Sequence, residues 1–320
     1  MDDLTTLLHE AVEDVEPTNR LADIRQQTRP RRAHRWYAAG GALLVAAAVV
    51  TAVTLAARSS TDPGPGPTQE PTAVDSGSTG ASASAVYYVG DTPQGPRLFR
   101  EFHQTKADPL DSALRWLTTA PIDPDYRTFW PQDALGAGWI DYAGGLATVQ
   151  LDGDSLRNRP DGMSAAEARL AVEQVVYTVQ AQAQQLIPVR FQVDGQPIDR
   201  VLGVPTSEPL TRGPELDVLA LVNISNPAEG REVVDTFSAD GVASSFEGTV
   251  PWELQDSSGA VVREGFAQGT VEDHLTPWET GAIDVSDLDP GTYTFEARTD
   301  DPTGGEGGGP TVDTRTVVIR

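Results

Sequence analysis

The residues that could perform catalysis are few, and they lie far apart along the chain. The four histidines, His9, His34, His103 and His274, show no metal-binding spacing such as HExxH. Cysteine is absent, which excludes disulfides, a thiol nucleophile and a Cys-ligated metal. There is no Gly-x-Ser-x-Gly elbow and no phosphate-binding loop. The sequence therefore predicts a protein that is not an enzyme and needs no cofactor. A catalytic pair of carboxylates stays possible, because the sequence does not give the distance between two such groups in space.

The loop Leu151–Gly162, LDGDSLRNRPDG, is the best candidate for a cation site. Asp152, Asp154 and Asp161 supply oxygen donors of the kind that calcium prefers. The loop lacks the alternating ligands, central glycine and terminal glutamate of an EF-hand. A polar loop between a strand and a helix is the stronger interpretation, and no metal site is predicted.

Aromatic side chains are the remaining candidates for binding. Phe129, Trp130, Trp139 and Tyr142 fall within FWPQDALGAGWIDY, and Trp278 lies in the loop-like stretch TPWE. Flat rings beside polar groups suit sugar rings and partner side chains. A small sheet domain needs most of its aromatics in the core. We therefore expect Trp130 and Trp278 to be the more exposed pair and to contact a ligand.

The net charge limits the choice of partner. The formal charge is −24, and the first 58 residues contain seven basic and seven acidic residues, so the whole excess lies in the remainder. Such a surface repels nucleic acid, anionic lipid headgroups and phosphate-rich polymers. Solubility is the simplest role for this charge, which is also compatible with cationic groups or divalent ions.

Residues 36–57 form an uncharged stretch long enough to cross a membrane. As a helix with about 1.5 Å per residue, these 22 residues would reach roughly 33 Å. Four arginines precede the stretch, and only Arg58 follows closely, so the positive-inside rule makes the N-terminus cytoplasmic. Because the stretch is long and 35 residues precede it, a retained anchor is favoured over a cleaved signal. The sequence predicts a single-pass protein of a bacterial cell membrane, with its C-terminal domains outside the cell.

Two further segments flank this predicted transmembrane helix. In the cytoplasmic tail, residues 1–35, apolar side chains recur at helical spacing from Leu4 to Val15. This pattern predicts a short amphipathic helix that meets a partner or the membrane surface, with a frayed tail as the alternative. Residues 58–85 are rich in Pro, Gly, Ser and Thr, which cannot bury a core, so an extended linker is expected there.

The first exported domain is expected over residues 86–212. VYYVG and LFREFH have the composition of strands. A helix is predicted to begin at Asp108, a hairpin to turn at Gly144-Gly145, and a second helix to begin with a capping box of Ser164 and Glu167. The total is an α+β domain with one antiparallel sheet and two helices. The strand residues expected to face inward are Val86, Tyr88, Leu98 and Phe102.

The order of these segments resembles the GerMN domain of sporulation and spore germination. The resemblance is carried by VYYVG, the helix around Ala113-Leu114, LATVQLD, AVEQVVYTVQA and VRFQVDGQPI, and it spans most of residues 86–205. It implies a fold and a setting in the cell envelope, and it brings no catalytic residues.

The second exported domain is expected over residues 216–320. Seven short strand-like runs are separated by turn signals, and alternation is clear at Val250, Trp252 and Leu254. This pattern predicts a two-sheet β-sandwich. The stretches NPAEGREV, ADGVASSFEGTVPWELQDSSGAVV, TPWE and PGTYTFEA are similar to the Gmad2 immunoglobulin-like domain, which commonly accompanies GerMN. This resemblance also implies an envelope setting without an active site.

Two functions fit this organisation. The first is a non-enzymatic envelope protein, related to sporulation or germination by family, that docks on peptidoglycan or on another envelope protein. The second is a signalling protein, whose exported part senses a wall ligand and whose cytoplasmic helix contacts a regulator.

Overall fold

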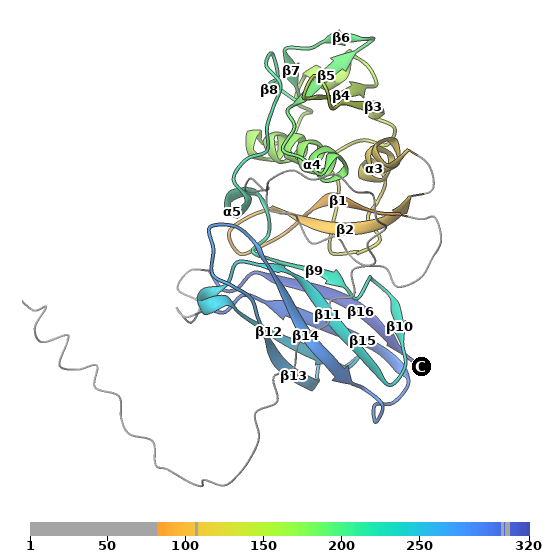
Figure 1. Cartoon of the computed structure of the whole chain (residues 1–320), viewed down its shortest axis with the longest axis vertical. Helices are drawn as coiled ribbons and strands as arrows, with labels where there is room; N and C mark the ends of the chain where they lie inside the picture. Colours follow the sequence, from red (N-terminus) through yellow and green to blue (C-terminus); the bar gives the residue numbers. More distant parts are fainter. Residues whose placement is uncertain (1–81, 106–107, 302–303, 305–307) are drawn as a thin grey trace, which may run out of the picture. The chain divides into compact units, whose positions relative to one another are not determined.

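The computed structural model describes residues 82–105, 108–301, 304 and 308–320, all of which belong to one compact unit, Pro67–Arg320. The predicted tail, the uncharged stretch Trp36–Ala57 and nearly all of the predicted linker lie outside the described residues. Within the described ranges, no helix has the length and apolar character needed to cross a membrane. The described residues form two lobes with separate hydrophobic cores, residues 82–220 and residues 221–320 (Figure 1).

The first lobe combines short sheets with two main helices. Its elements are β1 (Ser82–Gly90), β2 (Arg97–Thr105), α3 (Pro109–Leu117), β3 (Leu135–Asp141), β4 (Leu146–Leu151), η1 (Asp154–Arg157), α4 (Ala165–Ala183), β5 (Val189–Val193), β6 (Gln196–Pro197), β7 (Arg200–Val201), β8 (Val204–Pro205) and α5 (Glu215–Val218). Helices α3 and α4 lie between the β1–β2 hairpin and the β3–β4–β5–β6 sheet (Figure 1).

Capping residues define where both main helices begin. The Asp108 side chain accepts hydrogen bonds from the backbone N–H groups of Leu110 and Asp111 at the start of α3. Ser164 and Glu167 form the predicted capping box at the start of α4. Helix α4 is buried on nearly all sides, because it packs between the β1–β2 hairpin and the β3–β4–β5–β6 sheet. This placement makes the helix the centre of the lobe.

The prediction of one antiparallel sheet was wrong. The β1–β2 hairpin stands apart, and the four-stranded sheet is mixed, with β4 and β5 parallel. The chain between β4 and β5 crosses over through α4, and a crossover connection returns the chain in the same direction. The predicted hairpin at Gly144-Gly145 does join β3 and β4.

The β1–β2 hairpin is buried on both of its faces. Val86 and Tyr88 point into the core of the first lobe, as predicted, and Phe99 joins them there. Leu98 belongs to a separate cluster with Tyr87 and residues of the second lobe, so the expectation that it shares a face with Val86 was wrong. Side chains alternate along a strand, and the second lobe covers the face that a small free-standing domain would leave exposed.

The second lobe is a sandwich of a five-stranded and a three-stranded sheet, in the orders β10-β16-β15-β12-β13 and β14-β11-β9. The strands predicted from alternation are present, and in one of them Val250, Trp252 and Leu254 point into the core. The elements are β9 (Val222–Asn226), β10 (Arg231–Val233), β11 (Thr236–Ala243), η2 (Phe246–Gly248), β12 (Thr249–Gln255), β13 (Val261–Gln268), β14 (Thr276–Asp284), β15 (Gly291–Arg298) and β16 (Val312–Ile319).

Candidate functional site

The two tryptophans predicted to be the most exposed are both buried. Trp130 is 3% exposed, and its indole N–H donates a hydrogen bond of 2.8 Å to the carbonyl of Ala171 on α4. Trp278 is also 3% exposed and lies in the sandwich core. The stretch TPWE is not a loop but the start of β14, and strand alternation turns its tryptophan inward. Buried indoles of this kind present no face to a ligand.

Within the stretch FWPQDALGAGWIDY, the exposed aromatics are instead Trp139 and Tyr142, at 48% and 59% exposure. Trp139 lies on β3, and Tyr142 directly follows that strand. Within GWID, the polar Asp141 shares a face with Trp139, whereas Ile140 packs against the core. This alternation was the signal in the sequence that could have placed Trp139 outside.

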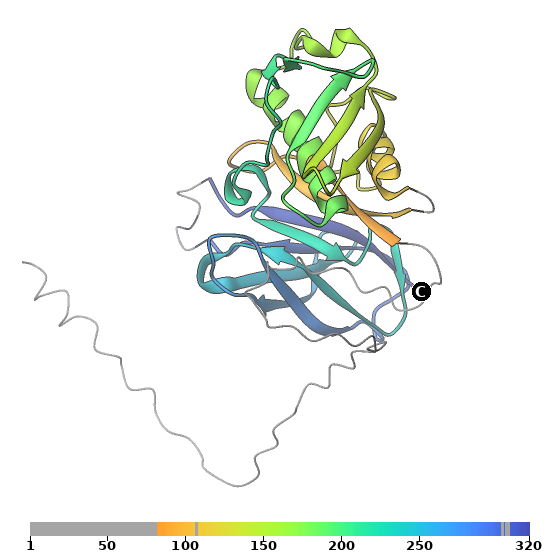
Figure 2. The ribbon, with the colours of Figure 1, turned by 45° about the horizontal axis from the view of Figure 1, so that its top comes forward.

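The strand register puts Trp139 in a row across three strands. Trp139 pairs with Thr148 on β4, and Thr148 pairs with Arg190 on β5. The core residues Val149 and Phe191 alternate with Thr148 and Arg190, so the row lies on the sheet face opposite α3 and α4. With its top brought forward, Figure 2 shows β3, β4 and β5 side by side. Thr148 in the middle of the row is buried, and the row brings an aromatic ring and a guanidinium to one face of the sheet on either side of it.

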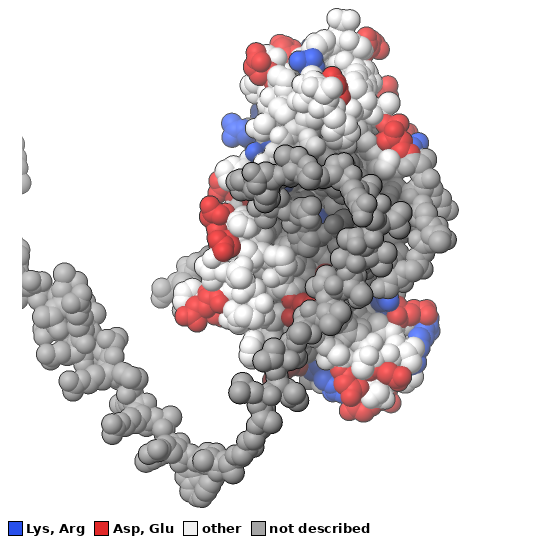
Figure 3. Space-filling view, in the orientation of Figure 1, with Lys and Arg blue, Asp and Glu red and all other residues white. Residues whose placement is uncertain are grey.

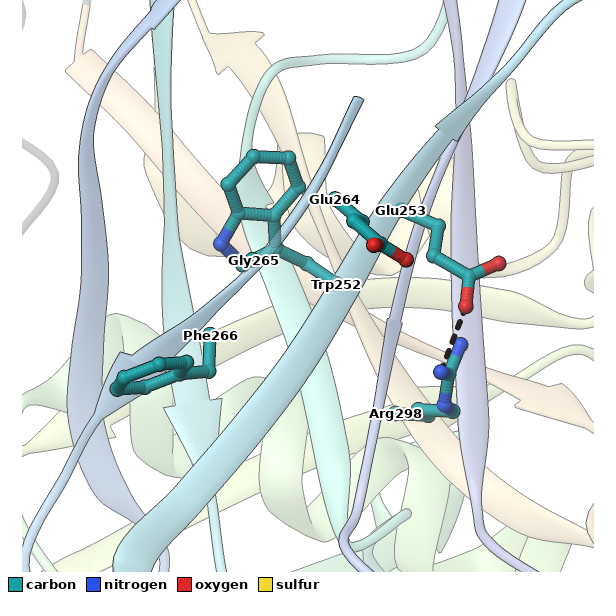
Figure 4. Close-up of a pocket in the computed structure, with 6 residues that line it drawn as sticks. All are labelled: Trp252, Glu253, Glu264, Gly265, Phe266 and Arg298. Atoms are coloured by element: carbon teal, nitrogen blue, oxygen red, sulfur yellow. Dashed lines mark ion pairs between the residues drawn. The ribbon is translucent and has the colours of Figure 1, made fainter. Parts of the chain in front are cut away.

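A shallow hollow of about 360 Å³ lies on the second lobe, between β12, β13 and β15 (Figure 4). The Trp252 ring packs on Gly265, where an added Cβ would come within 2.6 Å of the indole. Phe266 is 70% exposed at the rim. Arg298 is occupied by ion pairs of 2.6 Å to Glu253 and 3.1 Å to Glu296. Arg298 is thus held by two carboxylates, and Glu264, which also lines the hollow, is exposed to solvent.

His103, interpreted from the sequence as a surface or strand histidine, lies on β2 and is buried inside the first lobe. Its Nε2 lies 2.5 Å from Glu101 Oε1, and its ring stacks on Trp116 at 4.4 Å between centroids. The Glu101 carboxylate also accepts hydrogen bonds from the backbone N–H groups of Ile122 and Asp123. Burial opposes ionisation of Glu101, but these hydrogen bonds hold its pKa below the usual value. These contacts of the Glu101 carboxylate hold the loop that follows α3 in place.

Residues of that loop and of β16 form a cluster of buried charges at the junction between the lobes. Arg315 of β16 places Nη1 2.7 Å from Asp123 Oδ2 and 2.9 Å from Asp313 Oδ1. The Tyr126 hydroxyl donates to Asp313 Oδ1 at 2.5 Å, and the Ile224 N–H donates to Asp313 Oδ2 at 2.6 Å. All three charged residues are at most 4% exposed. We call Asp123, Tyr126, Asp313 and Arg315 the junction cluster.

Two buried carboxylates share one guanidinium in the junction cluster. Burial raises the pKa of Asp123 to about 7, against the opposing attraction of Arg315. Burial also raises the pKa of Asp313. An apolar cluster that includes Leu98, Leu219, Val242 and Leu275 continues the junction beside these groups. The polar side chains here hold the lobes together and line no cleft.

The raised pKa of Asp123 predicts that stability falls as pH rises. Between pH 4 and pH 7 the folded protein retains a proton on Asp123 that the unfolded chain has lost, so the free energy of unfolding decreases over this window. We expect a loss of about 1–2 kcal/mol between pH 5 and pH 7.5, measured by urea unfolding. Asp123→Asn removes the titrating group and should flatten this slope. An unchanged slope in the variant would assign the pH dependence to other groups.

The described residues hold no grouping of three or more His, Asp or Glu side chains able to bind a metal ion. In the loop considered as a calcium candidate, Asp154 pairs with Arg157 at 2.7 Å instead.

Family comparisons match both lobes. Residues 85–199 match the family described as sporulation and spore germination. Residues 221–306 match the immunoglobulin-like domain of bacterial spore germination. A comparison with curated protein sequences finds no match.

Two solved structures show distant similarity. The tandem GerMN domains of the sporulation protein GerM from Bacillus subtilis overlap with a TM-score of 0.35 at 16% identity, covering 65% of this chain and 63% of that one. This chain thus spans less than two thirds of that structure. CopC from Methylosinus trichosporium OB3b overlaps with a TM-score of 0.23 at 16% identity, covering 31% of this chain and 92% of that one.

Proposed function

We propose that this chain, in which a sporulation and spore germination domain precedes an immunoglobulin-like domain of bacterial spore germination, is a non-enzymatic scaffold of the cell envelope that docks on peptidoglycan. The uncharged stretch Trp36–Ala57 would anchor it in the membrane, with both lobes outside the cell.

The observation that carries this proposal is the junction between the lobes. An apolar cluster and the buried junction cluster join the two lobes, so that surfaces of both are presented as one body. Broad, fixed surfaces suit a scaffold, and the buried charged groups at the junction are already paired with one another. These features favour binding over turnover.

The acidic surface of the protein limits which wall polymer it can bind. Asp and Glu side chains are spread over the face seen in Figure 3. The net charge of −24 makes binding to phosphate-rich wall polymers unfavourable, so peptidoglycan is the more suitable wall ligand.

Co-sedimentation of the full chain, kept in mild detergent, with peptidoglycan stripped of other polymers tests the proposal. We expect saturable binding at low and moderate salt, and no comparable binding to cellulose particles. Absence of saturable binding would reject wall docking, and crosslinking in intact envelopes would then be used to seek a protein partner.

A further inference from the structure

We propose that the outer face of the β3–β4–β5 sheet binds an acidic saccharide, through stacking on Trp139 and an ion pair with Arg190. This inference rests on the proposed docking on peptidoglycan and names the face and the ligand chemistry. It is carried by the row that Trp139, Thr148 and Arg190 form across the sheet.

The first support is the exposure of Trp139. Its side chain is 48% exposed in the middle of a strand pair, whereas Trp130, Trp252 and Trp278 are each at most 9% exposed. An indole offers a large, rigid apolar face, and it loses little conformational freedom when a flat ring covers it. The C–H face of a pyranose ring has the matching shape and polarity.

The second support is the charge beside this ring. Arg190 is half-buried on β5, and among the described residues no carboxylate pairs with it. Arg298 in the hollow and Arg315 at the junction, by contrast, each pair with two carboxylates. An unpaired guanidinium in an acidic protein complements an anionic ligand, and a carboxylate suits its forked geometry.

The third support is the spacing within the row. Neighbouring strands lie about 4.8 Å apart, so the Cα atoms of Trp139 and Arg190 are roughly 10 Å apart across β4. One sugar stacked on the indole brings a carboxylate substituent within reach of the long arginine side chain. Glycan strands of peptidoglycan have this chemistry where the stem peptides are removed, because the lactyl group of N-acetylmuramic acid then carries a free carboxylate. The peptidoglycan used in the tests below is therefore first treated with an amidase that removes the stem peptides.

The test compares the full chain with matched variants. Trp139→Ala and Arg190→Gln should each weaken co-sedimentation with peptidoglycan at least tenfold, whereas Trp139→Phe should retain most of the binding because it keeps a ring. Phe266→Ala removes an exposed aromatic of the other lobe, and Arg169→Gln removes an exposed arginine of α4. Both controls should bind like the unchanged protein.

A second measurement distinguishes recognition of the ligand's carboxylate from nonspecific binding. The soluble disaccharide of N-acetylglucosamine and N-acetylmuramic acid should bind more tightly than chitobiose, its neutral counterpart, and Arg190→Gln should abolish the difference. Thermal melting confirms that each variant is folded, and Trp139→Leu or Arg190→Met, which also remove the ring or the charge, replaces a variant that is not.

The outcomes distinguish this inference from the proposed function. If peptidoglycan binds equally to the unchanged protein and to folded variants at Trp139 and Arg190, wall docking stands and this face is rejected. If the unchanged protein does not bind peptidoglycan, both are rejected. Equal affinity for the acidic and neutral disaccharides rejects the role of Arg190.

Discussion

Replacing Arg315 by methionine is expected to lower the free energy of unfolding by about 3–5 kcal/mol. The guanidinium bonds to Asp123, Asp313 and the carbonyl of Ile224, and it is 4% exposed. Its removal leaves two carboxylates buried without a counter-charge, and such groups are costly in a low-dielectric interior. Urea unfolding followed by circular dichroism measures the change.

Arg320→Met provides the matched control, because Arg320 lies only five residues further along the chain. Arg320 pairs with Glu232, but both side chains are about 60% exposed. Exposed ion pairs contribute little, so we expect this variant to lose no more than about 0.5 kcal/mol. If Arg315→Met lost equally little, the junction cluster would not be a stabilising contact between the lobes.

Gly241→Ala is expected to destabilise the second lobe by about 3 kcal/mol or more. An added Cβ would lie 1.9 Å from the carbonyl oxygen of Asn223 and 2.9 Å from the ring of Trp278. The first of these neighbours is backbone of the paired strand β9, next to a register shift, so the strand itself would have to move. The melting temperature of the full chain reports the effect.

Gly136→Ala tests the same substitution on another strand with a register shift. Its added Cβ would meet Gln150 at 3.4 Å, which is ordinary contact, and the position is exposed. We expect its melting temperature to stay within a few degrees of the unchanged protein. A similar loss in both variants would mean that glycine is needed for strand flexibility rather than for the close approach of β9.

Features encoded within a few residues were predictable from the sequence, and features that join distant segments were not. The caps at Asp108 and Ser164 and the Gly144-Gly145 hairpin depend on neighbouring residues, and all three are present. The second lobe was also predictable as a two-sheet sandwich, because its strands alternate regularly.

Most of the errors depend on distant segments, and one is local. Leu98 faces the second lobe because residues of that lobe cover its side, and a strand pattern does not state what will cover each face. Trp278 was misplaced because TPWE was interpreted as loop-like, whereas it begins strand β14. Asp123 and Arg315 are 192 positions apart, so no local pattern pairs them. His103 lies on a strand, one of its two interpretations, but the sequence pattern did not reveal that Glu101 and Trp116 enclose it.

The two-sided burial of the β1–β2 hairpin has a consequence for dividing the protein. Without residues 221–320, the first lobe would present Tyr87, Val89 and Leu98 to water on a two-stranded sheet. Exposed apolar strands of this kind favour self-association. The first lobe produced alone is therefore expected to aggregate, because its hairpin needs the second lobe to cover one face.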